Sequence, residues 1–140
     1  MFCRIAKERK DEKNLVVWRG KHCFLVMNLY PYNSGHLMVV PYLHTSDIGS
    51  LSDEINVEVM QAAVKGMKAL SKVSRPQGFN FGANLGRAAG AGIDEHVHFH
   101  VVPRWTGDTN FMPVLADVKL ISDEMKKTWS GLSKAIGRKK

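Results

Sequence analysis

The chain has 140 residues, of which 44% are hydrophobic, and this is enough material for the core of one domain. The formal net charge is +7, which favours anionic partners such as nucleotides. No apolar run approaches the roughly 20 residues of a membrane helix, and two cysteines exclude a disulfide framework. We therefore predict no membrane partner and a reducing, cytoplasmic location. The basic residues gather near the chain ends without interleaved aromatic residues, so no nucleic-acid partner is expected.

The first part of the chain predicts three strands. Two segments rich in β-forming residues, 15–19 and 22–29, are separated by Gly20, which predicts a hairpin. A loop follows, because the next residues are rich in Pro, Asn, Ser and Gly. A short third strand is predicted over residues 36–40 and ends at Pro41, which cannot continue a hydrogen-bonded ladder.

The rest of the chain predicts two helices and two further strands. Ser52 is a suitable N-cap for an amphipathic helix over residues 53–73, in which apolar residues recur at helical spacing. The remaining predicted elements are a strand over 79–84, a glycine-containing loop over 86–92, a strand over 96–102, and a helix over 122–136 with Ser122 as its N-cap. This order predicts an α+β fold, with an antiparallel sheet of about five strands and two main helices.

The last predicted strand carries three histidines, His96, His98 and His100, in alternation with apolar residues. Alternate side chains of a strand point to the same face, so the three imidazoles are expected to share one face while the apolar residues face the core. Ser, Thr or Lys would serve the solubility of an exposed face equally well. Three histidines at these positions therefore indicate a functional site.

Two kinds of chemistry suit this triad. Neutral imidazoles ligate zinc, copper or iron, and Asp94 and Glu95 directly precede the triad as further donors. Alternatively, a neutral imidazole attacks phosphorus and a neighbouring imidazolium protonates the leaving group. His36, at the start of another strand, and the glycine-containing loop over 86–92 favour the second interpretation, because backbone N–H groups of such a loop bind phosphate oxygens.

The triad fits the pattern His-φ-His-φ-His-φ-φ over residues 96–102, and Asn-Ser-Gly-His-Leu-Met-Val-Val-Pro precedes it at 33–41. Together these motifs resemble the histidine-triad (HIT) superfamily of nucleotide hydrolases and transferases. The segment 104–114 looks like the prokaryotic branch that acts on diadenosine tetraphosphate or triphosphate as a hydrolase or phosphorylase. The resemblance implies a HIT-like fold, a single histidine-triad domain over 1–140, a small-molecule nucleotide substrate and a homodimer.

The resemblance also implies residue roles. His98 would attack the α-phosphorus of a dinucleoside polyphosphate to form a nucleotidyl-histidine, which water or inorganic phosphate would then cleave. His100 would protonate the leaving group, His96 would support the geometry of the strand, and His36 would help to order the site. The implied nucleotide-binding residues are Asn28 at the ribose, Asn84 at the phosphates, and Ile5, Phe24 and Leu25 at the base.

A metal site and two other functions follow from the same resemblance. Zinc-binding members carry Cys-x-x-Cys near the N-terminus. Cys3, His44 and His96 match three of the four ligands, but the first cysteine would precede Met1, so no complete zinc site is predicted. Zinc, or a divalent ion that accompanies the polyphosphate, is the cofactor to test. The alternative functions are hydrolysis of nucleoside phosphoramidates and nucleotide or metal binding in a regulatory protein without turnover.

Overall fold

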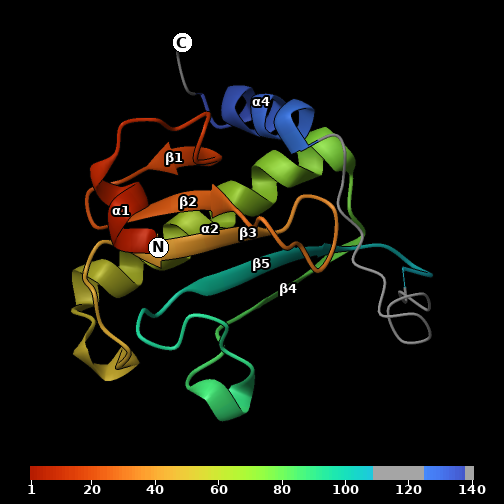
Figure 1. Ribbon diagram of the computed structural model, residues 1–140. Helices are drawn as coiled ribbons and strands as arrows, with labels where there is room; N and C mark the ends of the chain where they lie inside the picture. The colour runs from red at the N-terminus through yellow and green to blue at the C-terminus, as the bar shows by residue number, and fades with distance from the viewer. Residues whose placement is uncertain (109–124, 138–140) are drawn as a thin grey trace.

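The computed structural model describes residues 1–108 and 125–137, and a five-stranded antiparallel sheet lies at its centre (Figure 1). The strands follow one another across the sheet in the order β1-β2-β3-β5-β4. Because β5 lies between β3 and β4, it is an inner strand of the sheet. The strands are β1 (Val16–Arg19), β2 (Cys23–Met27), β3 (Leu37–Pro41), β4 (Gly78–Gly82) and β5 (Phe99–Arg104).

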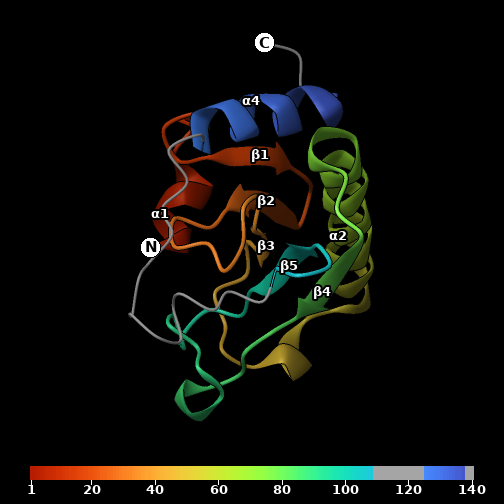
Figure 2. The same cartoon turned by 90° about the vertical axis from the view of Figure 1, so that its right-hand side faces the viewer.

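Helices cover both faces of this sheet (Figure 2). The long helix α2 (Asp53–Ser74) packs on β2, β3 and β5, and α4 (Met125–Ala135) packs on α2 and on β1. The short helix α1 (Phe2–Lys7) lies on the opposite side from α2. Two 3-10 turns, η1 (Ile48–Ser50) and η2 (Arg87–Ala89), lie in the connections. Within the described ranges, no helix is both long and apolar enough to cross a membrane.

Two hydrophobic clusters flank the sheet, and alternation along β2 divides its side chains between them. Leu25 belongs to the cluster on the side of α2, whereas Phe24 packs with Phe2 of α1 in the other cluster. Met38 of β3 also belongs to the cluster on the side of α1, and it is paired with His100 of β5. The register therefore places the histidines on the face that α1 partly covers.

The α+β fold, the strand order along the chain and the long helix are confirmed, and Ser52 accepts a hydrogen bond from the backbone N–H of Ile55 at 3.5 Å. Several strand boundaries were wrong. The predicted strands over 22–29 and 79–84 end earlier, at Met27 and Gly82, and Pro41 is the last residue of β3 and pairs with Cys23. The ladder of β5 begins at Phe99, so two triad histidines precede it. The cause is the backbone N–H of Val97, which donates to the Thr45 carbonyl at 2.7 Å and joins this segment to the chain beyond β3. Ser122 and the end of the segment 104–114 lie outside the described residues.

Candidate active site

Three histidines from two distant parts of the chain meet on the α1 side of the sheet, and His96 lies beyond them on the same side. His36 directly precedes β3, and its ring centroid lies 5.0 Å from that of His100, which lies 4.9 Å from that of His98. His36, His96 and His98 are buried, with exposed fractions of 0%, 3% and 5%. Gly35 makes the turn into β3 with φ of +81°, where a Cβ would stand 2.8 Å from Leu70. The structure thus brings together His36, His98 and His100, and it places the fourth predicted catalytic histidine, His96, beside Cys3 and His44.

The hydrogen bond of His98 fixes which of its ring nitrogens is available. Its Nδ1 lies 2.9 Å from the backbone carbonyl oxygen of His96. A carbonyl oxygen only accepts, so this nitrogen carries the proton and donates it. A neutral imidazole has one N–H group, and the Nε2 of His98 is therefore left with its lone pair. This is the protonation state that a nucleophilic imidazole requires.

His36 and His100 form a chain of hydrogen bonds with a defined direction. The backbone N–H of Tyr32 donates to Nδ1 of His36 at 3.1 Å, and the side-chain amide nitrogen of Asn28 lies 3.3 Å from the same atom. The proton of neutral His36 is therefore on Nε2, which donates to Nδ1 of His100 at 2.9 Å. The proton of neutral His100 is in turn on Nε2. The Nε2–H of His100 is therefore the group at the end of these hydrogen bonds that can donate to a ligand.

The same environment keeps this pair uncharged. Burial away from water, together with the proximity of His100 and His98, lowers the pKa of His36 to about 3. Burial, together with nearby His98, lowers the pKa of His100 to about 4. The sequence predicts an imidazolium as the proton donor, whereas His100 at rest is a neutral N–H donor. A bound polyphosphate would raise both pKa values, because negative charge favours the protonated form.

These two histidines predict that acid destabilises the fold. The pKa of histidine in an unfolded chain is about 6.5, above the values of about 3 for His36 and about 4 for His100 in the fold. Between about pH 6.5 and 4 the unfolded chain binds more protons. The free energy of unfolding therefore falls as the pH falls, by at most about 1.4 kcal/mol per pH unit for each group.

Urea unfolding at several pH values measures this dependence. We expect the stability to be retained above about pH 6.5 and lost progressively below it. Since carboxylates also titrate below about pH 5, the comparison is with His36→Asn, which should show a shallower slope between pH 6.5 and 5. Equal slopes in the two proteins would contradict the assignment.

His96 faces away from the other triad histidines, toward a group of metal-ligand atoms. Its Nε2 donates to the carbonyl of Pro41 at 2.9 Å, so its Nδ1 has the lone pair. This Nδ1 lies 3.7 Å from Sγ of Cys3 and 3.1 Å from Nδ1 of His44, and the cysteine sulfur lies 3.3 Å from His44. Tetrahedral zinc with ordinary bond lengths separates its ligand atoms by about 3.3–3.6 Å. The three residues therefore fit such an ion, with a fourth position left for another ligand.

The predicted nucleotide-binding residues are placed differently from one another. Asn28 contacts His36, and Asn84 lines a groove of about 400 Å³ together with His100. Ile5 of α1 and Phe24 of β2 lie on the triad side of the sheet, but both are buried in the cluster between α1 and the sheet. The structure does not bring Leu25 to the site, because this residue packs under α2. Consecutive residues of a strand point to opposite faces, so Phe24 and Leu25 cannot both face the base.

Two residues of the site were not found by sequence analysis. Phe2 is buried, and its ring centroid lies 5.5 Å from that of His96 and 5.2 Å from that of His98. Arg19 holds the helix that carries Phe2 and forms an ion pair with Asp11 at 2.8 Å. The guanidinium of Arg19 also donates to the last carbonyls of α1 and its C-cap, those of Ile5, Ala6 and Glu8. A six-residue helix is too short to show a periodicity in the sequence, so α1 was not predicted. Without α1, neither the place of Phe2 nor the role of Arg19 in holding the helix could be found.

Comparison with known proteins agrees with the resemblance that the sequence motifs show. The family model described as HIT domain matches residues 9–107. A Mycobacterium tuberculosis protein named AP-4-A phosphorylase is 49% identical over 118 residues, which are 84% of this chain and 60% of that protein. The chain thus spans 60% of the length of this curated relative. Adenosine 5'-monophosphoramidase hnt1 of Schizosaccharomyces pombe is 32% identical over 104 residues, which are 74% of this chain and 73% of that protein.

Solved structures share the fold. The crystal structure of a zinc-bound histidine triad family protein from Mycobacterium smegmatis superposes with a TM-score of 0.80. The match covers 98% of this chain and 92% of that protein, at 22% sequence identity. The open five-stranded antiparallel sheet with its helices therefore matches the fold of that protein.

Proposed function

The chain belongs to the HIT domain family, and from this premise we propose that it cleaves dinucleoside polyphosphates, such as diadenosine tetraphosphate, at the α-phosphate. The observation that supports the proposal most directly is the hydrogen bond from Nδ1 of His98 to the carbonyl of His96. It leaves the Nε2 lone pair of a buried imidazole as the attacking atom. The 49% identity to a protein named AP-4-A phosphorylase supports the same class of substrate.

In the proposed reaction, Nε2 of His98 forms a bond to the α-phosphorus, and the bond from phosphorus to the bridging oxygen breaks. The leaving oxygen takes its proton from Nε2 of His100, which the chain through His36 orients. The positive charge that develops on His98 is stabilised by the carbonyl that accepts from its Nδ1–H. Inorganic phosphate or water then attacks the nucleotidyl-histidine and gives its proton back to Nε2 of His100. The bond from phosphorus to Nε2 of His98 breaks, which releases a nucleotide and restores neutral His98.

Product analysis tests the function. We expect diadenosine tetraphosphate to give ADP plus ATP only when inorganic phosphate is present, as the name of the M. tuberculosis relative indicates for that protein. AMP plus ATP without phosphate would instead assign a hydrolase. Absence of turnover under both conditions would contradict the proposal and favour the regulatory, binding-only hypothesis.

A nucleoside phosphoramidate hydrolase is the second candidate, because one relative is named an adenosine 5'-monophosphoramidase. The same nucleophile and proton donor serve both reactions, which differ in the leaving group. Turnover of adenosine 5'-phosphoramidate at a higher kcat/KM than diadenosine tetraphosphate would favour this function. We expect the reverse order.

We also propose that Cys3, His44 and His96 bind one zinc ion, which would fix the start of α1 beside the triad. The support is the lone pair of His96 Nδ1, which points at the other two donors. Elemental analysis of protein purified without chelator should find about one zinc ion per chain, and Cys3→Ser should lower this content to a small fraction. His22→Ala, which removes an imidazole outside the group, is the matched control. Equal zinc content in Cys3→Ser and His22→Ala would contradict the site.

We further propose a dimer, a single domain and a cytoplasmic location. We propose that two copies join at β4, whose exposed Phe81 stacks on Phe99 at the sheet edge opposite β1. Light scattering should give the mass of two chains if this dimer forms.

A single histidine-triad domain over residues 1–140 is supported by the packing of Phe2 and Leu132, which lie outside the range matched by the family model, on the clusters that flank the sheet. The two free cysteines support a reducing cytoplasm.

A further inference from the structure

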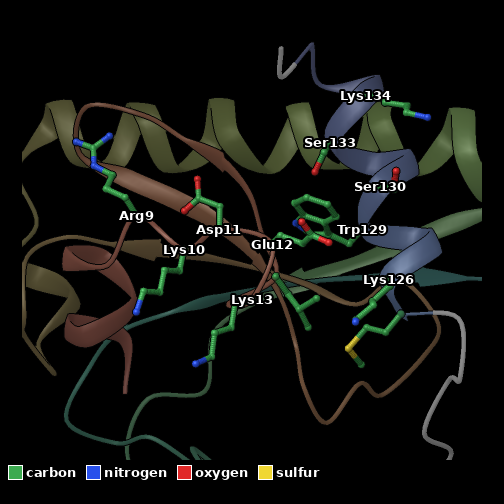
Figure 3. Close-up of a pocket in the computed structure, with 12 residues that line it drawn as sticks. Arg9, Lys10, Asp11, Glu12, Lys13, Lys126, Trp129, Ser130, Ser133 and Lys134 are labelled. Atoms are coloured by element: carbon green, nitrogen blue, oxygen red, sulfur yellow. The ribbon is translucent and has the colours of Figure 1, made fainter. Parts of the chain in front are cut away.

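A second cavity lies away from the triad, between residues 9–15 and α4. Its volume is about 1040 Å³, which is large enough for a nucleotide. Figure 3 shows the side chains of residues 9–13 on one side of it and those of α4 on the other. The cavity adjoins β1 at one edge of the sheet, and β2 and β3 separate this strand from β5. A ligand there would not occupy the triad site.

Five of the twelve residues that line this cavity are cationic. Within the described ranges, none of its cationic side chains forms an ion pair. Of the two acidic residues in the lining, Asp11 is bound to Arg19 at 2.8 Å, which leaves Glu12. The cationic residues are Arg9, Lys10, Lys13, Lys126 and Lys134. So many cations around one cavity favour an anionic occupant with more than one negative charge.

The cavity also has an apolar and aromatic part. Leu15 and Met125 line it, and the indole of Trp129 is held in place by a hydrogen bond from Nε1 to the carbonyl of Val16 at 3.0 Å. A fixed indole beside aliphatic side chains suits a planar aromatic group such as a nucleobase. Ser133 lines the same cavity with an exposed fraction of 6%, and its hydroxyl has no hydrogen-bond partner in the described part of the chain.

Leu15 is an independent indication of a functional surface. This buried residue has φ of +56°, in the left-handed region that non-glycine residues rarely adopt. The turn before it is held by hydrogen bonds from the backbone N–H groups of Leu15 and Val16 to the carbonyls of Glu12 and Asp11. Backbone strain of this kind collects at ligand-binding sites, where the surrounding structure maintains it.

We propose that this cavity is a second nucleotide-binding site, in which the lysines bind the phosphates and the base lies against Trp129. The proposal combines the charge, the fixed indole, the unpartnered hydroxyl of Ser133 and the strained turn at Leu15. It does not depend on the reaction at the triad, because none of the lining residues has been assigned to that site.

Calorimetric titration with ADP tests the stoichiometry. We expect two ADP molecules per chain in the unmodified protein and one in the double variant Lys10→Gln/Lys126→Gln. The matched control, Lys21→Gln/Lys68→Gln, removes two exposed lysines outside the cavity and should keep both sites. A stoichiometry in Lys10→Gln/Lys126→Gln that equals that of the unmodified protein would overturn the proposal.

The indole N–H of Trp129 locates the second molecule. We expect its signal in a ¹H–¹⁵N spectrum, assigned by its loss in Trp129→Phe, to shift with ADP in the unmodified protein and in Lys21→Gln/Lys68→Gln. The apparent affinity from this shift should fall at least tenfold in Lys10→Gln/Lys126→Gln. A signal that stays unmoved at saturating ADP would overturn the location. Tripolyphosphate that binds as tightly as ADP would overturn the role of the base.

Discussion

Replacing His98 with alanine is expected to lower kcat for diadenosine tetraphosphate by at least about 10⁴-fold, the scale seen when an enzyme loses its nucleophile. The variant loses the only attacking atom of the proposed reaction, and neither His36 nor His100 is oriented to replace it. Nucleotide binding should change by less than about threefold, because the proposed ribose and phosphate contacts at Asn28 and Asn84 do not involve His98.

Single-turnover experiments with a labelled substrate measure both parts of this prediction. The unmodified protein should form a labelled nucleotidyl-protein adduct that is stable to base and labile to acid, and His98→Ala should form none. His22→Ala removes an imidazole outside the triad and should keep normal turnover. If His98→Ala retained the turnover of the unmodified protein, the assignment of the nucleophile would be wrong.

The second large effect is expected at the pair formed by His36 and His100. His100→Ala should lower kcat by about 10²–10⁴-fold, the usual contribution of a proton donor, with a smaller change in KM. His36→Ala should lower kcat by about 10²-fold, because His100 loses the N–H that directs its own proton to Nε2.

The double variant tests whether His36 and His100 act together through their hydrogen bond or independently. If His36 acts through His100, then His36→Ala/His100→Ala should be about as slow as His100→Ala alone. Additive losses would show that His36 contributes by another route. A substrate with a very good leaving group, such as a nitrophenyl nucleotide ester, should reduce the loss in all three variants, since less protonation is needed. The same loss with both substrates would contradict proton donation.

The sequence was informative where local patterns carry the structure. Alternation around the triad placed its histidines on one side of the chain, and the spacing of apolar residues located α2 to within one residue at its C-terminal end. The motif at 33–41 marked His36 as a partner of the triad. These features depend on neighbours in the chain, which a single sequence displays directly.

The remaining features depend on contacts between distant residues. Cys3 and His96 are 93 residues apart, and only the packing of α1 brings the sulfur beside the imidazole. Arg19 appears in the sequence as a charged residue at the end of a strand, whereas its guanidinium binds the last carbonyls of another element. The nitrogen that is protonated in each histidine also depends on its hydrogen-bond partner, such as the Pro41 carbonyl for His96. No local pattern in the sequence indicates such a partner.

The sheet order has a consequence for how the protein folds. β1, β2 and β3 form consecutive antiparallel pairs, and β4 and β5 form another. The pair of β3 and β5, exemplified by Leu37 and Val101, closes a much longer loop that contains all of α2. Loop closure of this length is slow, so we expect the two units to form before they dock. During refolding, helical circular dichroism should return before catalytic activity, because His36 and His100 meet only at docking. The β4–β5 pair that carries His100 is thus complete early, while the candidate site is complete last.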